Sequence, residues 1–186
     1  MHWRMLVLSD LQLLPVPGQF FAFSDAYIDS AESLCNELCA ASESTTYAHG
    51  AVVMSLTFHS IELFLKAAIL QRAPSEQFSG NTGHDLGYLY RRYTNLYPGK
   101  AYELDLPFKR EALDTEGLDP RLAEELLALI RQREKVMPED QMHRYPTDVN
   151  VQPWKALLGF EPHSFQQILK QIKSDFVRIR EQMERG

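Results

Sequence analysis

The segment from Tyr47 to Ala73 constrains the fold more than any other part of this sequence. It reads as one long helix that is apolar on nearly every face, and such a helix belongs in the middle of a bundle. One polar stripe interrupts it, formed by Ser55, His59, Glu62 and Lys66 at spacings of four, three and four residues. That spacing places all four side chains on one helix face. Because burying an unpaired charge is unfavourable, we expect the stripe to be paired or to line a cleft.

Helical periods on both sides of this segment predict its neighbours. Residues 1–23 end in a Pro15–Gly18 breaker and are expected to be an extended lead-in, and Ser24 is the expected N-cap of the first helix. Residues 24–186 are expected to form a single domain. Three further helices are predicted. The first follows Thr82 as its N-cap and has Asp85 in its first turn, the second follows Asp119, and the third begins at Glu161–Pro162. The sequence therefore predicts an all-α bundle of four to five helices.

Two segments interrupt this helical pattern. Residues 101–108 alternate between apolar and polar side chains, which is typical of a short strand, and a minor two-stranded hairpin with Val149 and Val151 is an open alternative. The stretch from Pro138 to Pro162 is predicted to be a long loop, a feature that in compact domains is usually functional or flexible.

The last predicted helix carries a narrow apolar seam. Its members are Phe165, Leu169, Ile172, Phe176, Ile179 and Met183, which repeat at alternating spacings of four and three residues. Two interpretations stay open: packing onto the bundle, or an interface that makes the protein a homodimer.

Composition narrows the functional classes. The formal net charge is −6, so nucleic-acid binding would need a local basic patch rather than a global positive field.

The two cysteines, Cys35 and Cys39, are too few for a thiolate zinc site and are expected to be buried, free thiols. No stretch is expected to reach the ~20 apolar residues that cross a bilayer, and no secretion signal is seen. The expected location is the cytoplasm.

Three sets of residues carry potential chemistry. Glu62 and Lys66 form an i,i+4 pair that is either a structural ion pair or part of a cleft facing His84. His84–Asp85 suggests a metal-dependent hydrolase of the HD type, which also needs a second histidine and a further aspartate; the candidates are His49, His59, Asp105, Asp114 and Asp119. His143 and Arg144 would serve as base and phosphate clamp in metal-free RNA cleavage, or lie in a surface turn anchored by Tyr145. No cofactor motif is present, and none is expected.

Three segments together resemble the HEPN family of helical domains (higher eukaryotes and prokaryotes nucleotide-binding). They are His59–Ala67, Gly83–Leu86 and Arg144–Pro146, the last ahead of a final amphipathic helix. The resemblance implies a helical bundle that is often dimeric. It also implies a role with RNA, nucleotides or an antitoxin-like partner protein in bacterial stress, phage-defence or toxin–antitoxin systems.

Active members of that family look like metal-independent endoribonucleases with an arginine followed, four to six residues on, by a histidine. Here Arg133 is the nearest arginine upstream of His143, and nine residues separate the two. The resemblance therefore implies a divergent or non-catalytic binding module. Its cleft would be lined by His59, Glu62, Lys66, His84 and Arg144, with Asp85 and Tyr145 beside them. An endoribonuclease using His143 and Arg144, and the HD-type hydrolase, are the alternatives.

Overall fold

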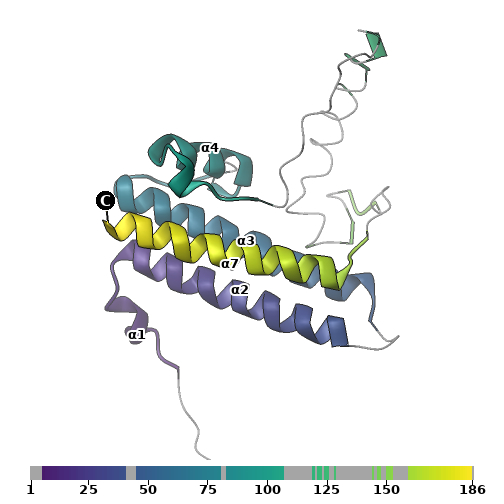
Figure 1. Cartoon of the computed structure of the whole chain (residues 1–186), viewed down its shortest axis with the longest axis horizontal. Coiled ribbons are helices and arrows are strands. Elements are labelled where there is room, and N and C mark those ends of the chain that lie inside the picture. Colours follow the sequence, from purple (N-terminus) through teal and green to yellow (C-terminus); the bar gives the residue numbers. More distant parts are fainter. Residues whose placement is uncertain are drawn as a thin grey trace, which may run out of the picture.

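The architecture is an all-α bundle, as predicted. The computed structural model describes residues 6–40, 45–80, 83–106, 119, 121, 122, 124, 125, 128, 144, 146, 147, 150–152 and 159–185. Three long helices lie side by side in this part of the chain: α2 (Val16–Ala40), α3 (Tyr47–Arg72) and α7 (Pro162–Arg185) (Figure 1). The shorter α4 (Leu86–Leu96) packs on α3, the 3-10 helix η2 (Lys100–Tyr102) packs on α7, and α1 (Ser9–Gln12) precedes α2.

Helix α3 is the core helix, and its bounds match the predicted segment to within a residue. Phe64 shows how it is held: its ring stacks on Phe176 of α7 at a centroid distance of 3.9 Å and meets the edge of Phe21 of α2 at 5.3 Å. By length and composition α3 is apolar enough to cross a membrane, so the expectation that no segment reaches that threshold is wrong. The apolar window is 72% buried inside the bundle, as expected of a core helix.

Helices α2 and α3 approach closely where two small polar residues meet. The Ser24 hydroxyl donates to the Ser60 carbonyl at 2.9 Å, and the Ser60 hydroxyl donates to the Ser24 carbonyl at 2.8 Å. Both serines are fully buried, so this reciprocal pair satisfies the hydroxyl groups inside the interface.

The N-terminal boundary differs from the prediction. Residues Ser9–Gln12 are helical and α2 already begins at Val16, so the extended lead-in is wrong over the described residues 6–23, and so is the N-cap at Ser24. Pro17 lies in the first turn of α2, where a backbone N–H has no intrahelical acceptor, and a proline is therefore tolerated there. The Pro15–Gly18 segment, a type of sequence that often ends a helix, therefore lies at the beginning of one here.

The predicted strand at residues 101–108 is also wrong where the structure describes it. Residues 100–102 form η2, and residues 103–106 belong to no helix or strand. Side chains satisfy this backbone instead: Tyr93 donates to the Tyr102 carbonyl and Tyr90 to the Leu104 carbonyl. Arg178 of α7 donates to the carbonyls of residues 101 and 103, and Asp175 accepts the N–H of residue 105.

The segment around Val149 and Val151, which was predicted to pair with that strand, is not a strand either where the structure describes it. Val151 has a φ angle of 60°, which belongs to the left-handed region and does not fit a strand. Val149 lies outside the described residues.

The apolar seam of the last helix packs inside the chain. All six seam residues of α7 are buried, and α7 lies against α2 and α3. The packing interpretation of the seam is therefore confirmed. The homodimer stays a prediction, but it must use another surface.

Candidate functional site

The polar stripe of α3 converges on one buried carboxylate, that of Glu62, which is 2% exposed. Its Oε1 atom lies 2.7 Å from Lys66 Nζ, one turn later on the same helix. The same oxygen lies 3.0 Å from Nδ1 of His84. A buried carboxylate that receives two such hydrogen bonds is well compensated for its loss of solvent. Ser55, the first stripe residue, is half-buried further toward the start of α3.

The second oxygen of Glu62 faces two more basic side chains. Oε2 lies 3.9 Å from Nδ1 of His59 and 4.0 Å from Nη2 of Arg144. These separations are ion-pair distances rather than hydrogen bonds. The four basic side chains come from three separate parts of the chain: α3, the turn before α4, and the segment at residue 144. We call Glu62, His59, Lys66, His84 and Arg144 the Glu62 cluster.

Exposure divides the Glu62 cluster into an inner and an outer layer. The side chain of Lys66 is 8% exposed, so Lys66 and Glu62 form a buried pair. His59 and Arg144 are about one-third exposed, at 32% and 31%, and His84 is 68% exposed. Two imidazoles and one guanidinium therefore border solvent, while the carboxylate lies beneath them.

The charges of the Glu62 cluster do not balance. Even without the two histidines, Lys66 and Arg144 carry two positive charges against the single negative charge of Glu62. Burial lowers the pKa of His59 below its ordinary value; Glu62 opposes this shift, and Arg144, Lys66 and His84 add to it. The unmatched positive charge borders solvent, so the cluster is suited to an anionic ligand.

The placement of His84 follows from the helix that it precedes. Asp85 is the N-cap of α4, and its carboxylate accepts the backbone N–H of Tyr88 at 2.8 Å. This fixes the turn that directs His84 toward Glu62. Asp85 itself is a capping residue and makes no contact with Glu62 that the structure records. The predicted cap, Thr82, lies outside the described residues.

Two aromatic residues beside the Glu62 cluster were not predicted as site residues. Tyr27 of α2 meets the His59 ring edge-on at a centroid distance of 4.5 Å. Lys66 Nζ lies 5.4 Å from the centre of the Phe78 ring, within range of a cation–π interaction. No sequence motif marks Tyr27 or Phe78 as a site residue, because their proximity to the Glu62 cluster depends on the tertiary fold.

Of the residues of the HD-type alternative, His59 and His84 meet at Glu62, whereas the other described candidates make separate contacts. His49 hydrogen-bonds to Thr46 at the start of α3, and Asp85 caps α4. Asp119 accepts backbone N–H groups from Arg121 and Leu122. Among the described residues, no group of three or more His, Cys, Asp or Glu side chains is arranged to hold a metal ion.

The remaining site predictions fall on residues that the structure does not describe. His143, Tyr145 and Asp114 lie outside the described residues. Arg144, which follows His143, is described, and it contributes to the Glu62 cluster.

Comparison with known proteins assigns no family to the chain and no function to the Glu62 cluster. No protein-family model matches the chain, and neither a curated protein nor a solved structure does so.

Proposed function

We propose that this chain is a HEPN-like helical domain that binds RNA through the Glu62 cluster. The observation that carries the proposal is the convergence of four basic side chains from three chain segments on one buried carboxylate. A phosphodiester is the anion that this surplus of positive charge suits. The setting that we infer is a cytoplasmic bacterial stress, defence or toxin–antitoxin system.

Glu62 supports the proposal as a positioning residue. The Glu62 carboxylate accepts the Nδ1–H of His84, which fixes that ring and leaves Nε2 of the neutral ring as an acceptor for a ribose hydroxyl or a base N–H. Arg144 adds a planar guanidinium, the group best matched to the oxygens of a phosphate. Lys66 is nearly buried, so its role is to neutralise Glu62 rather than to reach the ligand.

The position of Tyr27 leads us to propose that the protein prefers single-stranded RNA. Its ring contacts His59 and is half-buried at the edge of the Glu62 cluster. Unstacked bases bind to aromatic side chains of this kind, whereas the bases of a duplex are already stacked. We therefore expect single-stranded RNA to bind more tightly than a duplex.

Fluorescence anisotropy with a labelled single-stranded RNA tests this proposal. Binding should weaken between about 50 and about 200 mM KCl, because phosphate contacts release counterions. Each of the variants Arg144→Ala and His84→Ala should weaken binding about tenfold, the effect of losing one hydrogen bond to the ligand. His163→Ala is the matched control, because His163 is exposed at the start of α7. Absent or salt-independent binding, or an equal loss in the control, would contradict the proposal.

Arg144 also favours a second candidate, a metal-independent endoribonuclease. Arg144 belongs to the Glu62 cluster, and His143 precedes it in the sequence. His143 would take the proton of a ribose 2′-hydroxyl as general base, and Arg144 would stabilise the charge that develops on the phosphate. RNA cleavage that survives EDTA and is lost in His143→Ala supports this candidate. Background cleavage by both proteins removes it.

A further inference from the structure

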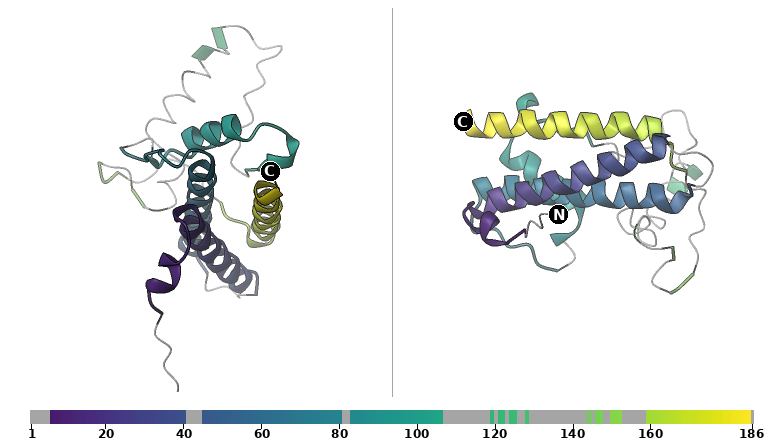
Figure 2. Two further views of the ribbon diagram at one scale, coloured as in Figure 1. Left: turned by 90° about the vertical axis from the view of Figure 1, so that its left-hand side faces the viewer. Right: turned by 90° about the horizontal axis from the view of Figure 1, so that it is seen from below.

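Helix α4 lies on the outside of the bundle, where it packs on α3 (Figure 2). Both of its ends are fixed to that helix. The turn before α4 holds His84 against Glu62, and at the other end the hydroxyl of Tyr97 donates to the Ala68 carbonyl at 2.9 Å. The outer face of α4 therefore begins at the Glu62 cluster and continues from it.

The tyrosines of α4 show which of its faces the fold uses. Tyr90, Tyr93 and Tyr97 each donate a hydroxyl hydrogen bond to a backbone carbonyl, so they hold α4 and the segment after it in place. Tyr88 differs from them, because it is 37% exposed. An aromatic ring that borders solvent is a surface on which an unstacked base can stack.

The same helix carries positive charge in an acidic chain. The net charge is −6, yet residues 86–102 contain Arg91, Arg92 and Lys100 and no aspartate or glutamate. The fold uses Arg92, which donates to Glu76 at 2.8 Å. Arg91 is exposed, and its guanidinium forms no ion pair with any residue that the structure describes. The charge of Arg91 is therefore available to a phosphate.

Gly87 allows Arg91 to lie back over the first turn of α4. A Cβ atom at Gly87 would lie 3.5 Å from Nη1 of Arg91 and 3.2 Å from Oδ1 of Asp85. The guanidinium thus lies beside the turn that contains His84. The Asp85 carboxylate is occupied there as the helix cap, where it accepts a backbone N–H. Arg91 extends the positive charge of the Glu62 cluster onto α4.

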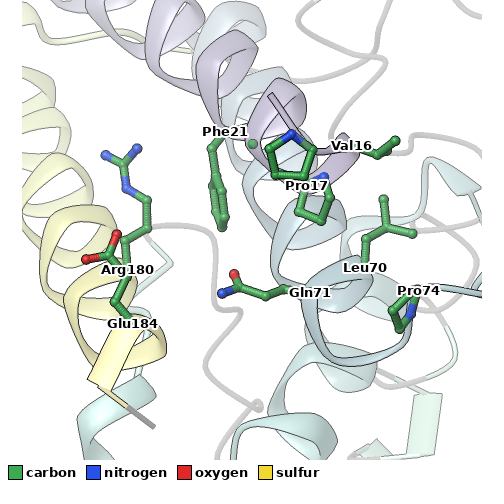
Figure 3. Close-up of a pocket in the computed structure, with 10 residues that line it drawn as sticks. Val16, Pro17, Phe21, Leu70, Gln71, Pro74, Arg180 and Glu184 are labelled. Atoms are coloured by element: carbon green, nitrogen blue, oxygen red, sulfur yellow. The ribbon is translucent and has the colours of Figure 1, made fainter. Parts of the chain in front are cut away.

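A pocket elsewhere in the bundle offers no such continuation. Its volume is about 620 Å³, and it lies where the start of α2 meets the ends of α3 and α7 (Figure 3). Its lining is mainly apolar, and the guanidinium of Arg180 in its wall is paired with Asp25 at 2.7 Å. A phosphodiester chain therefore meets more favourable charge on α4 than in this pocket.

We propose that the Glu62 cluster and the outer face of α4 form one binding track for single-stranded RNA, in which Arg91 binds a phosphate and Tyr88 stacks on a base. The proposal rests on RNA binding by the Glu62 cluster, and it defines the ligand further as an oligonucleotide rather than a single nucleotide. From Leu86 to the exposed Asn95, α4 extends roughly 14 Å at ~1.5 Å per residue. A stacked strand of about four nucleotides spans that length at ~3.4 Å per nucleotide.

Fluorescence anisotropy with two labelled uridine oligonucleotides tests the binding track. A strand of about twelve nucleotides covers the Glu62 cluster and α4 together, whereas a dinucleotide is too short to do so. Arg91→Ala and Tyr88→Ala should each weaken the complex with the long strand about tenfold. Both should leave dinucleotide binding at the Glu62 cluster unchanged. The two residues are exposed, so the fold should survive, and far-UV circular dichroism verifies it.

Salt dependence separates the two roles on α4. Arg91→Ala should lower the slope of log K against log [KCl] by about 0.7, the contribution of one phosphate contact to a single strand. Tyr88→Ala should keep the wild-type slope, since stacking on a ring neutralises no phosphate, and Tyr88→Phe should keep wild-type affinity. Lys170→Ala is the matched control, because it removes one positive charge from the exposed surface of α7; its affinity should equal that of the wild type.

The possible outcomes distinguish the binding track from the proposal on which it rests. If Arg144→Ala weakens the complex with the long strand but Arg91→Ala and Tyr88→Ala do not, the track is overturned and the Glu62 cluster alone is the binding site. Equal weakening of the long and the short complexes by an α4 variant also overturns the track, because that residue would then act through the cluster. A loss in Lys170→Ala as large as that in Arg91→Ala does the same. A wild type that binds neither strand overturns both proposals.

Discussion

Two sets of charged residues in this molecule differ in their balance of charge and in their burial. The Glu62 cluster gathers four basic side chains around one carboxylate that is almost fully buried. The second set lies between α2 and α7, where acids on α2 face bases on α7. We call it the α2–α7 ladder; its pairs are Arg180 with Asp25 at 2.7 Å, and Lys173 with Asp29 at 2.8 Å and Glu32 at 2.5 Å.

The difference separates a structural feature from a candidate binding site. In the α2–α7 ladder three acids meet two bases, all of them partly exposed, so the ladder leaves no positive charge for a ligand. In the Glu62 cluster the bases exceed the acids, and the single acid lies beneath them. Fold stability alone requires one partner for Glu62, and Lys66 supplies it; His59, His84 and Arg144 exceed that requirement.

The largest effect should come from removing the central carboxylate. Glu62→Ala leaves the Lys66 ammonium buried without its partner, and we expect a loss of about 3–5 kcal/mol of unfolding free energy. Asp25→Ala, in the α2–α7 ladder, removes a partly exposed pair and should lose less than ~1 kcal/mol. Urea denaturation of both variants measures the difference. Equal losses of unfolding free energy would mean that the two sets of charges contribute equally to stability.

Replacing both members of the buried pair should recover most of this loss. Glu62→Met combined with Lys66→Met removes the two charges together and keeps similar volume, which often preserves stability in buried pairs. We expect the double variant to unfold within about 2 kcal/mol of the wild type. RNA affinity should nevertheless fall, because His84 loses the acceptor that orients it.

Separate readouts of stability and binding are what make the double variant informative. A stable double variant with wild-type RNA affinity would show that Glu62 has no positioning role. A double variant as unstable as Glu62→Ala would instead show that the pair itself is required for the fold.

The sequence predicted the core helix well because two independent patterns agreed in it. The apolar run defined α3, and the 4-3-4 spacing put Glu62, His59 and Lys66 on one face, where the structure also has them. A cleft facing His84 was one of two open interpretations of the stripe, and the resemblance favoured it; no local rule relates residues 22 positions apart. Tyr27 and Phe78 were missed for the same reason.

The wrong predictions have two physical origins: one local signal was misread, and another was read without its tertiary partners. Pro17 was taken as a breaker, although the first turn of a helix accepts proline. The alternation at residues 101–108 does mark an inward-facing side, with Leu104 buried. Its backbone hydrogen bonds go to Tyr90, Tyr93, Asp175 and Arg178 rather than to a strand. Periodicity indicates which side chains are buried but not which groups satisfy the backbone.

Acid should destabilise the Glu62 cluster through His59. The pKa of His59 is lowered in the folded protein, chiefly by burial, so the unfolded chain binds the proton more readily. Stability from this residue is complete above the ordinary histidine pKa of about 6.5 and decreases as pH falls through that value toward the lowered one. Urea midpoints between about pH 7.5 and about pH 5.5 should therefore fall less steeply in His59→Gln than in the wild type. A slope in His59→Gln parallel to that of the wild type would contradict the assignment.

The smallest effect belongs to the α2–α7 ladder and should depend on salt. Lys173 is 34% exposed and is hydrogen-bonded to acids on α2, which raise its pKa. Lys173→Ala should lose no more than ~1 kcal/mol, and the loss should shrink as salt rises, because charges at the surface are screened. Lys170→Ala is the control, since Lys170 bonds to Gln166 of its own helix. A larger, salt-independent loss would mean that the α2–α7 ladder resembles the buried Glu62–Lys66 pair, and the contrast between the two regions would fail.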